Sequence, residues 1–413
     1  MLSAGHAIRR CVAAAASAAA LAALAFAPSC AQGPTVVQLP SDVATPVGGI
    51  RLARVLLLEG VRSAALSVYA PYAVEPWGPR ARGTPTVLAQ CPPLAGGEVR
   101  ATPSALIIGD RHFPDQQVLL NIQAPAALAL NGQRYRGNLL VRRAGEELVS
   151  LINVLHVEDY LYGVLGGETF PAWPPAALEA QAIVARSYTL WRMAQRRDEP
   201  FDLYATVMDQ NYLGMAKEDP HLRAAVDRTA GMVLLYQMNL FRCYYHSTCG
   251  GHTEAVQEVF PDPPLLPLGG VPCRFCKDSP HFSWQRGISE AQLADAVGRR
   301  WPSIRPLASL AVTRQTATGR AAELLLSAGP GRQATVAASD FRLAVGASKL
   351  PSTFFEVRAT GGGYTFTGRG FGHGVGMCQW GARGMAQAGY SAIEILRHYY
   401  PGAQLTRLYE RPP

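Results

Sequence analysis

The chain has few charged residues and no segment in which charges of one sign gather. Asp, Glu, Lys and Arg make up 16% of its 413 residues and apolar residues 48%, which is typical of a globular protein and not of a disordered one. No run of five or more basic residues occurs, which argues against a nucleic-acid groove. No glycine recurs at every third position, which excludes collagen, and no block repeats at a fixed period, which argues against a solenoid or propeller.

Long apolar runs are also missing after the first thirty residues, so nothing later is predicted to span a membrane. At the start, Arg9 and Arg10 precede an uncharged, alanine-rich run over 12–27, and small residues follow it. This order predicts a secretory signal peptide over residues 1–31. Lipid attachment at Cys30 is the less favoured alternative, because the residues before it fit a lipidation motif poorly. We therefore expect an exported protein of the periplasm or cell envelope.

Short strand-like segments dominate as far as residue 157. They are β-branched or alternating and are separated by Gly, Pro and Asp turns, which is typical of antiparallel strands. The clearest lie at 50–58, 61–68, 105–108, 118–122 and 148–154. We interpret residues 32–150 as a β-rich region with a long loop over 77–94.

Helical patterns begin after Val157. A short helix is predicted over 159–165, and Pro174-Pro175 begins a longer one that runs to about Arg197. The longer helix is apolar over two faces, so we expect it to be central and buried. Further helices are expected at 290–300, 340–345 and 392–399, and further strands at 233–236, 243–246, 310–314, 322–326 and 364–368. The predicted fold class is α+β, with a β-rich N-terminal region joined to a mixed α/β catalytic core over 151–405, built around one long buried helix.

Glu168 is the first residue that could carry chemistry. It lies between the two expected helices, and we place it on a turn beside Phe170 and Trp173. Apolar surroundings disfavour the charged form of a carboxyl group and raise its pKa, which allows a glutamate to act as a general acid. Judged on spacing alone, a helix-end or surface glutamate is the simpler interpretation.

Two further motifs combine glycine with polar side chains. The first, 245–252, holds His246, Ser247 and Cys249 before Gly250-Gly251, and we favour a tight turn over a Cys–His nucleophile pair. The second, 368–381, is rich in glycine around His373, and its spacing fails the dinucleotide fingerprint. Its glycines either let the backbone approach a ligand closely or only satisfy positive φ angles.

These segments together resemble the stage II sporulation protein D / LytB (SpoIID/LytB) amidase-enhancer family. The resemblance covers roughly residues 140–405 in the family's order, and it is looser from residue 50. It rests on 157–164, Glu168 with Pro171, 176–188, Tyr245-His246-Ser247, 250–254, 370–381 and 398–402.

The resemblance implies a lytic transglycosylase that cleaves peptidoglycan glycan strands stripped of their stem peptides, without a cofactor. Its catalytic acid would be Glu168, the glutamate of the family's E-x-x-P segment. That residue would protonate the oxygen between MurNAc and GlcNAc, and the sugar's own 6-hydroxyl would close a 1,6-anhydro ring. Because the substrate supplies the nucleophile, the second carboxylate of ordinary glycosidases is not needed. A cell-wall amidase is a candidate partner, and no nucleic acid is expected.

Two alternatives compete with the transglycosylase. A non-catalytic wall-binding protein that enhances an amidase would not need the Glu168 carboxyl. A Cys–His peptidase built on Cys249 or Cys378 with His373 ranks last.

The cysteines depart from the family pattern. Some members bind zinc through Cys and His residues shortly after the long helix, but the matching stretch 202–210 has neither residue type, so that site is absent. Instead, Cys249, Cys273, Cys276 and Cys378 accompany motifs where sporulation members often have serine. They predict two disulfides or a four-cysteine zinc site, and we favour disulfides because the compartment is oxidising.

The motifs are predicted to converge on one cleft. Arg186, a charged residue on the apolar helix, should pair with a carboxylate or with carbonyls near the Glu168 turn, because an unpaired buried Arg is costly. Loops beside regular elements often form sites. The residues expected to line or support the cleft are Gln181, Arg186, His246, Ser247, Gly250, Gly251, Gly372, His373, Gly374 and Gln379.

Overall fold

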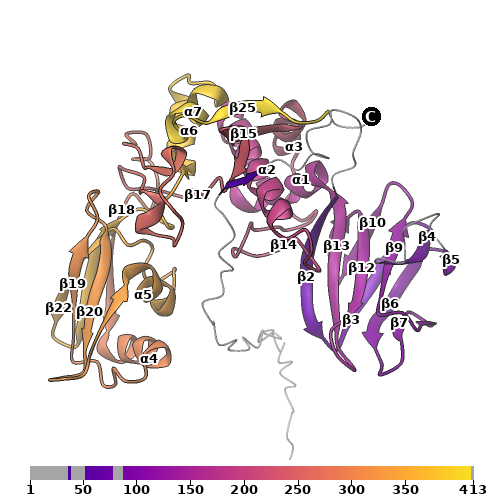
Figure 1. Cartoon of the computed structure of the whole chain (residues 1–413), viewed down its shortest axis with the longest axis horizontal. Coiled ribbons are helices and arrows are strands. Elements are labelled where there is room, and N and C mark those ends of the chain that lie inside the picture. Colours follow the sequence, from indigo (N-terminus) through magenta and orange to yellow (C-terminus); the bar gives the residue numbers. More distant parts are fainter. Residues whose placement is uncertain (1–35, 39–51, 78–86, 411–413) are drawn as a thin grey trace, which may run out of the picture. The chain divides into compact units, whose positions relative to one another are not determined.

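The computed structural model of the chain describes residues 36–38, 52–77 and 87–410 (Figure 1). The expected signal peptide over 1–31, with Cys30, lies outside the described residues. Strands and helices both contribute many elements, which confirms the α+β class. Within these ranges, no helix is long and apolar enough to cross a membrane.

Two sheets form the β-rich region. One has the strand order β11-β10-β3-β6-β7-β8, and the other has the order β14-β2-β13-β12-β9-β4-β5. A single apolar cluster takes residues from both sheets, such as Leu106 and Leu151, so the sheets pack face to face. The strands are β2 (Leu52–Val61), β3 (Ser63–Val68), β4 (Tyr72–Pro76), β5 (Ala89–Cys91), β6 (Leu94–Ala101), β7 (Leu106–Ile108), β8 (Arg111–Phe113), β9 (Gln117–Ile122), β10 (Ala127–Leu130), β11 (Gln133–Arg136), β12 (Asn138–Arg143), β13 (Val149–His156) and β14 (Leu203–Tyr204). The short strand β5 lies inside the stretch that we expected to be a loop.

The helical core surrounds the long helix α2 (Pro175–Gln195), whose middle is buried on all sides as predicted. It contains α1 (Val157–Glu168), α3 (Pro220–Arg228), α6 (Gln379–Gln387), α7 (Ala392–Tyr399) and a sheet of β1 (Val36–Gln38), β16 (Asn239–Phe241), β15 (Met232–Tyr236) and β25 (Gln404–Arg407). All of these helices contact α2. Helix α1 is joined to it by one loop, whereas the other helices are more than 20 residues away from it in the sequence. We use "helical core" for these elements.

Three helices differ from the expectation. Helix α1 continues to Glu168 instead of ending near residue 165. Helix α3 was not expected, although Asp219 caps it and Pro220 occupies its first turn. Helix α6 was not expected either, and it begins inside the glycine-rich motif with the Cys378 side chain as its cap.

Residues 283–369 form a separate group of elements with its own apolar core, which we call the inserted module. Its two three-stranded sheets are β18-β23-β22 and β19-β20-β21. The elements are β18 (Ser283–Ser289), α4 (Glu290–Arg300), β19 (Ser309–Gln315), β20 (Ala321–Ser327), β21 (Gln333–Ala337), α5 (Ala338–Val345), β22 (Phe355–Thr360) and β23 (Gly363–Arg369). The two ends of the module are neighbours, because Ser283 pairs with Arg369 in the ladder and the Gly370 N–H donates to the His281 carbonyl at 2.9 Å.

The two glycine-containing motifs contact each other, although the inserted module separates them in the sequence. Strand β17 (Tyr245–His246) pairs in parallel with β24 (Met377–Cys378), although the two strands are more than 120 residues apart in the sequence. Two short 3₁₀ turns, Val256–Glu258 and Leu266–Leu268, lie in the segment that leads from β17 to the module.

Candidate functional site

Glu168 is the last residue of α1, so it lies at a helix end and not on a free turn. Two glycines precede it inside the helix, and both face a neighbouring loop. A Cβ on Gly166 would lie 2.3 Å from the Lys217 carbonyl oxygen, and one on Gly167 would lie 2.1 Å from that of Asn211. The glycines therefore let the loop pack directly on the helix, which allows the Asn211 N–H to donate to Glu168 Oε1 at 2.8 Å.

The Glu168 carboxyl group is half-buried, and burial raises its pKa. Hydrogen bonds from the Asn211 N–H and from the side chains of Gln379 and Tyr245 oppose this rise but do not cancel it. The carboxyl group also sits at the negative end of the α1 dipole, which disfavours a negative charge. The pKa is therefore raised as expected from the apolar setting, and a larger fraction of Glu168 is protonated near neutral pH than of an ordinary glutamate.

Gln379 links Glu168 to the central helix. Its Nε2 donates to the Glu168 backbone oxygen at 3.1 Å and to Gln181 Oε1 at 3.4 Å. Gln379 begins α6 and Gln181 lies in the middle of α2, so the two amides connect three helices. The structure thus brings together these two predicted residues and Glu168.

Tyr245 and His373 connect the two glycine-containing motifs to Glu168. The Tyr245 hydroxyl bonds the Glu168 carboxyl group and accepts a hydrogen bond from Gln210 Nε2 at 3.2 Å. The Val375 N–H donates to His373 Nδ1 at 3.1 Å, so the His373 proton is assigned to Nε2, which donates to the Tyr245 carbonyl at 2.8 Å. Burial lowers the pKa of His373 well below its usual value, so the ring is neutral. His373 therefore holds the strand that carries Tyr245. Tyr245 in turn contacts Glu168, so one residue links His373 to the candidate acid.

His246 and Ser247 lie on the same strand and just after it. His246 Nδ1 is 3.0 Å from the Val375 carbonyl oxygen, and burial lowers the pKa of His246 to about 3. The Ser247 carbonyl accepts from the Trp380 N–H at 3.0 Å, and its hydroxyl lies 3.3 Å from that of Thr248. These contacts join the three motifs to one another, but none of the residues predicted to line the cleft lines the pocket described below, so their part in a cleft stays a prediction.

The glycines of these motifs pack against protein. Gly372 has φ of 108°, and a Cβ there would lie 2.9 Å from the His246 Cβ. A Cβ on Gly374 would lie 2.8 Å from Arg320 Cζ, and one on Gly250 would lie 2.8 Å from the Arg369 Cβ. Glycine is therefore required for packing and for positive φ at these positions, and also for the φ of 121° at Gly251. A contact between these glycines and glycan stays a prediction.

Arg186 pairs with a carboxylate, as predicted, but at the other end of α1. Its Nη2 lies 2.6 Å from Glu158 Oε2, and both side chains are 0% exposed. The guanidinium also donates to the Met232 and Val226 carbonyls. Burial would raise the pKa of Glu158, but Arg186, together with the Tyr409 hydroxyl and the Gly231 N–H, lowers it below its usual value. The expectation that this pair fixes the Glu168 end is wrong, because Arg186 faces the first turn of α1.

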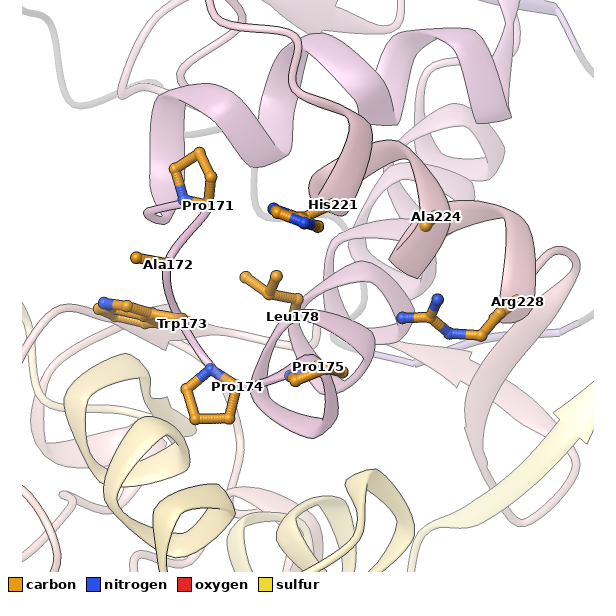
Figure 2. A pocket seen from close by; sticks show the side chains of 9 residues that line it. All are labelled: Pro171, Ala172, Trp173, Pro174, Pro175, Leu178, His221, Ala224 and Arg228. Carbon is orange, nitrogen blue, oxygen red and sulfur yellow. The ribbon is translucent and has the colours of Figure 1, made fainter.

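The segment that follows Glu168, from Pro171 onward, lines one side of a pocket of about 400 Å³. Figure 2 shows the loop 171–174 along one side of it and α3, with His221 and Arg228, along the other. The lining residues are Pro171, Ala172, Trp173, Pro174, Pro175, Leu178, His221, Ala224 and Arg228. Beside it, Phe170 is 59% exposed, and its ring lies 5.7 Å from that of Trp173. An apolar and aromatic surface is therefore formed by the residues that directly follow the candidate acid in the chain, although Glu168 itself does not line the pocket.

The four cysteines converge, but not as disulfides. Within the described residues every cysteine is free, including Cys91 and Cys243. Cys249 Sγ lies 3.6 Å from Cys276 Sγ, and the sulfurs of Cys249, Cys273, Cys276 and Cys378 lie within 4.8 Å of one another. A disulfide bond is about 2.05 Å long, so the expected pair of disulfides is not present. Cys249 and Cys378 are fully buried, which does not favour either as a nucleophile.

Sequence reasoning did not find Asn211, and it did not single out the phenol of Tyr245 as a partner of Glu168. Tyr245 belongs to the 245–252 motif, and this position is the signal that could have indicated its role. The Asn211 contact depends on a loop 43 residues away from Glu168, and no local pattern indicates it.

Comparison with known proteins supports the family resemblance. Residues 146–236 match the family described as stage II sporulation protein, and residues 274–376 match a domain family of unknown function. An uncharacterized protein of Brachyspira hyodysenteriae is 33% identical over 67% of this chain and 73% of its own length. Stage II sporulation protein D of Bacillus subtilis is 28% identical over 60% of this chain and 74% of its own length. The amidase enhancer of the same organism is also 28% identical over 60% of this chain, but only 40% of its own length is covered. The chain belongs to the SpoIID/LytB family.

Proposed function

We propose that this protein is an exported lytic transglycosylase that cleaves peptidoglycan glycan strands, with Glu168 as the catalytic acid. The observation that carries the proposal is the state of the Glu168 carboxyl group. It is half-buried at a helix end, its pKa is raised, and its three hydrogen-bond partners are neutral groups. A carboxyl group in such a setting is protonated to a larger extent than an ordinary glutamate and can deliver its proton to a glycosidic oxygen.

The proton transfer needs only this one carboxyl group. Glu168 gives its proton to the oxygen between MurNAc and GlcNAc as the bond from that oxygen to the MurNAc anomeric carbon breaks. The resulting carboxylate then takes the proton of the MurNAc 6-hydroxyl as that oxygen bonds to the anomeric carbon, which yields a 1,6-anhydro sugar. Proton and leaving group balance, so no water and no second carboxylate enter the reaction, in contrast to ordinary glycosidases.

The neighbouring groups have supporting parts in this proposal. Gln379 and the Asn211 N–H orient the carboxyl group, and both bonds favour its ionised form after the proton has left. The exposed ring of Phe170 and the pocket lined by Trp173, which come two to five residues after Glu168 in the chain, would offer flat apolar surface for sugar rings. Strands without stem peptides are the proposed substrate class.

Replacement of Glu168 tests the proposal directly. Glu168→Gln keeps the shape and most hydrogen bonds but removes the proton donor. We expect the rate of cleavage of purified, peptide-free glycan to fall by about 10²-fold or more. The measurement is the formation of 1,6-anhydro ends by mass spectrometry, with Glu290→Gln, an exposed residue of α4, as the matched control. Wild-type cleavage by Glu168→Gln would overturn the assignment.

A second candidate is a non-catalytic protein that enhances an amidase. It is favoured by the name of one relative, the amidase enhancer. Under this alternative, wild-type protein produces no anhydro ends, and both wild-type and Glu168→Gln protein raise the rate at which a cell-wall amidase releases stem peptides from intact peptidoglycan. The two assays, run on the same preparations, separate the candidates.

A further inference from the structure

The four buried cysteines form a second feature, which the reaction at Glu168 does not use. They come from three separate segments. Cys249 follows β17, Cys273 and Cys276 lie in the loop before the inserted module, and Cys378 ends β24 after the module. Their exposed fractions are 0%, 2%, 0% and 0%, respectively.

The spacing of the sulfurs fits a tetrahedral metal site. Four thiolates at about 2.3 Å from a central zinc ion lie about 3.8 Å from one another. Here all four sulfurs lie within 4.8 Å of one another, and Cys249 and Cys276 lie 3.6 Å apart. Two independent disulfides would need only pairs of sulfurs to meet, whereas a single metal ion requires all four to surround one point.

Hydrogen-bond donors point at the sulfurs, as they do around bound thiolates. The N–H of Cys249 and that of Gly381 donate to Cys378 Sγ at 3.2 and 3.3 Å. The Gly251 N–H donates to Cys249 Sγ at 3.4 Å, and the Tyr399 hydroxyl lies 3.1 Å from Cys273 Sγ. Such outer contacts stabilise negative charge on the ligands and hold them in place.

Two glycines make these contacts possible. Gly251 has φ of 121°, which side chains rarely allow. A Cβ on Gly381 would lie 2.6 Å from Cys273 Sγ and 1.9 Å from the Tyr399 hydroxyl. A larger residue at position 381 would therefore push into the space between Cys273 and Tyr399, and one at position 251 would strain the backbone that places the Gly251 N–H.

A buried cation lies beside the cluster. Four thiolates and one Zn²⁺ carry a net charge of about −2, which is costly in an apolar interior unless it is balanced. Arg320, from the inserted module, is 1% exposed, and its Nη2 donates to the Cys249 and His252 carbonyls at 2.6 and 3.2 Å. The Glu254 carboxylate lies 3.9 Å from Arg320 Nε and takes part of this positive charge.

We propose that Cys249, Cys273, Cys276 and Cys378 bind one structural Zn²⁺ ion. The ion would join the chain just before the inserted module to the chain just after it. It would also hold Cys378, and with it Gln379, whose amide contacts Glu168. Its part is to position the site, because a closed set of four protein ligands leaves no place for a substrate.

The test begins with the metal content of the whole purified protein. We expect about one zinc ion per chain, the stoichiometry of a closed four-ligand site, by elemental analysis. Cys276→Ser should lose this zinc, and Cys91→Ser, which changes another buried free cysteine in β5, should keep it. The same result is expected whether or not Glu168 proves to be an acid, so the two proposals fail separately.

A second measurement covers the case in which Cys276→Ser does not fold. Wild-type protein is freed of metal with a chelator and loaded with Co²⁺, and we expect the intense visible bands of tetrahedral, thiolate-bound cobalt. Mass spectrometry of unreduced wild-type protein should find all four cysteines as thiols. Protein that carries disulfides between these cysteines and no metal, or one iron ion in place of zinc, would overturn the proposal.

Discussion

The helical core and the inserted module bury different kinds of side chain. The core encloses the ion pair of Glu158 and Arg186, and its buried polar groups include Gln181 and Gln210. The module is filled by residues such as Leu324, Phe341 and Phe366. Its charged residue that is fully buried, Arg320, points out of the module toward Cys249. The core thus buries a charged pair together with polar amides, whereas the interior of the module depends mainly on apolar packing.

The largest expected effect comes from breaking the buried ion pair of the core. Arg186→Met leaves the Glu158 carboxylate buried without its partner, which should lower the free energy of unfolding by about 3–5 kcal/mol. Urea denaturation measures it. The matched change in the module, Arg358→Met, removes one member of a pair whose side chains are 84% and 75% exposed. It should change the free energy of unfolding by less than about 0.5 kcal/mol. Equal effects of the two variants would refute the contrast.

The module should be sensitive to lost apolar volume instead. Leu324 is 0% exposed, and Leu324→Ala should lower the free energy of unfolding by about 2–5 kcal/mol through the cavity that it leaves. Glycan cleavage by the folded variant should stay at the wild-type rate, because Leu324 lies in the apolar core of the module. Leu343→Ala, at a position that is 67% exposed, is the control and should be nearly neutral. A loss of cleavage in folded Leu324→Ala would show that the two regions are coupled.

The core should also respond to acid through Glu158. Its pKa in the folded protein is below the usual 4.5, so the pair contributes stability above that pH and loses it as the pH falls through the lowered pKa. We expect the free energy of unfolding of the wild-type protein to decline over this acid range. In Glu158→Gln the decline should be shallower, as measured by urea titrations at a series of pH values. A parallel decline in both proteins would contradict this role of Glu158.

The smallest effect is expected at Glu168, and it has the opposite sign. Its pKa is raised in the folded protein, so the stability linked to this group is present at low pH and is lost as the pH rises through the raised pKa. Glu168→Gln cannot titrate and should therefore be slightly more stable than the wild type on the alkaline side of that pKa. The midpoints of thermal unfolding of the two proteins should diverge as the pH rises. Cleavage by the wild type should decline over the same range, because the acid loses its proton.

Local signals explain what the sequence predicted well. The capping boxes at Ser289 and Ser391 mark the starts of α4 and α7, and both are present. The two prolines mark the start of α2, and its apolar faces predict that it is buried. Asp219 with Pro220 is an equally local signal, and it marks the start of α3.

Contacts between distant segments explain the rest. Gly166-Gly167 suggests a helix end, but α1 continues through these glycines because the loop at 211–217 packs on them. Arg186 could be predicted to need a carboxylate, but which end of α1 supplies it depends on the packing of two helices. The spacing of Cys273 and Cys276 is readable in the sequence. Their meeting with Cys249 and Cys378 depends on the pairing of β17 with β24.

The closeness of the two ends of the inserted module has a consequence for how such chains can vary. Ser283 and Arg369 are partners in one ladder, so their Cα atoms are about 5 Å apart, and a link of two or three residues could join them. The segment therefore behaves as a cassette. It could be lengthened or exchanged without altering the path of the chain on either side, as long as the contacts of Arg320 with the Cys249 and His252 carbonyls are kept. Apart from these contacts, the helical core and the cassette can then vary separately in evolution.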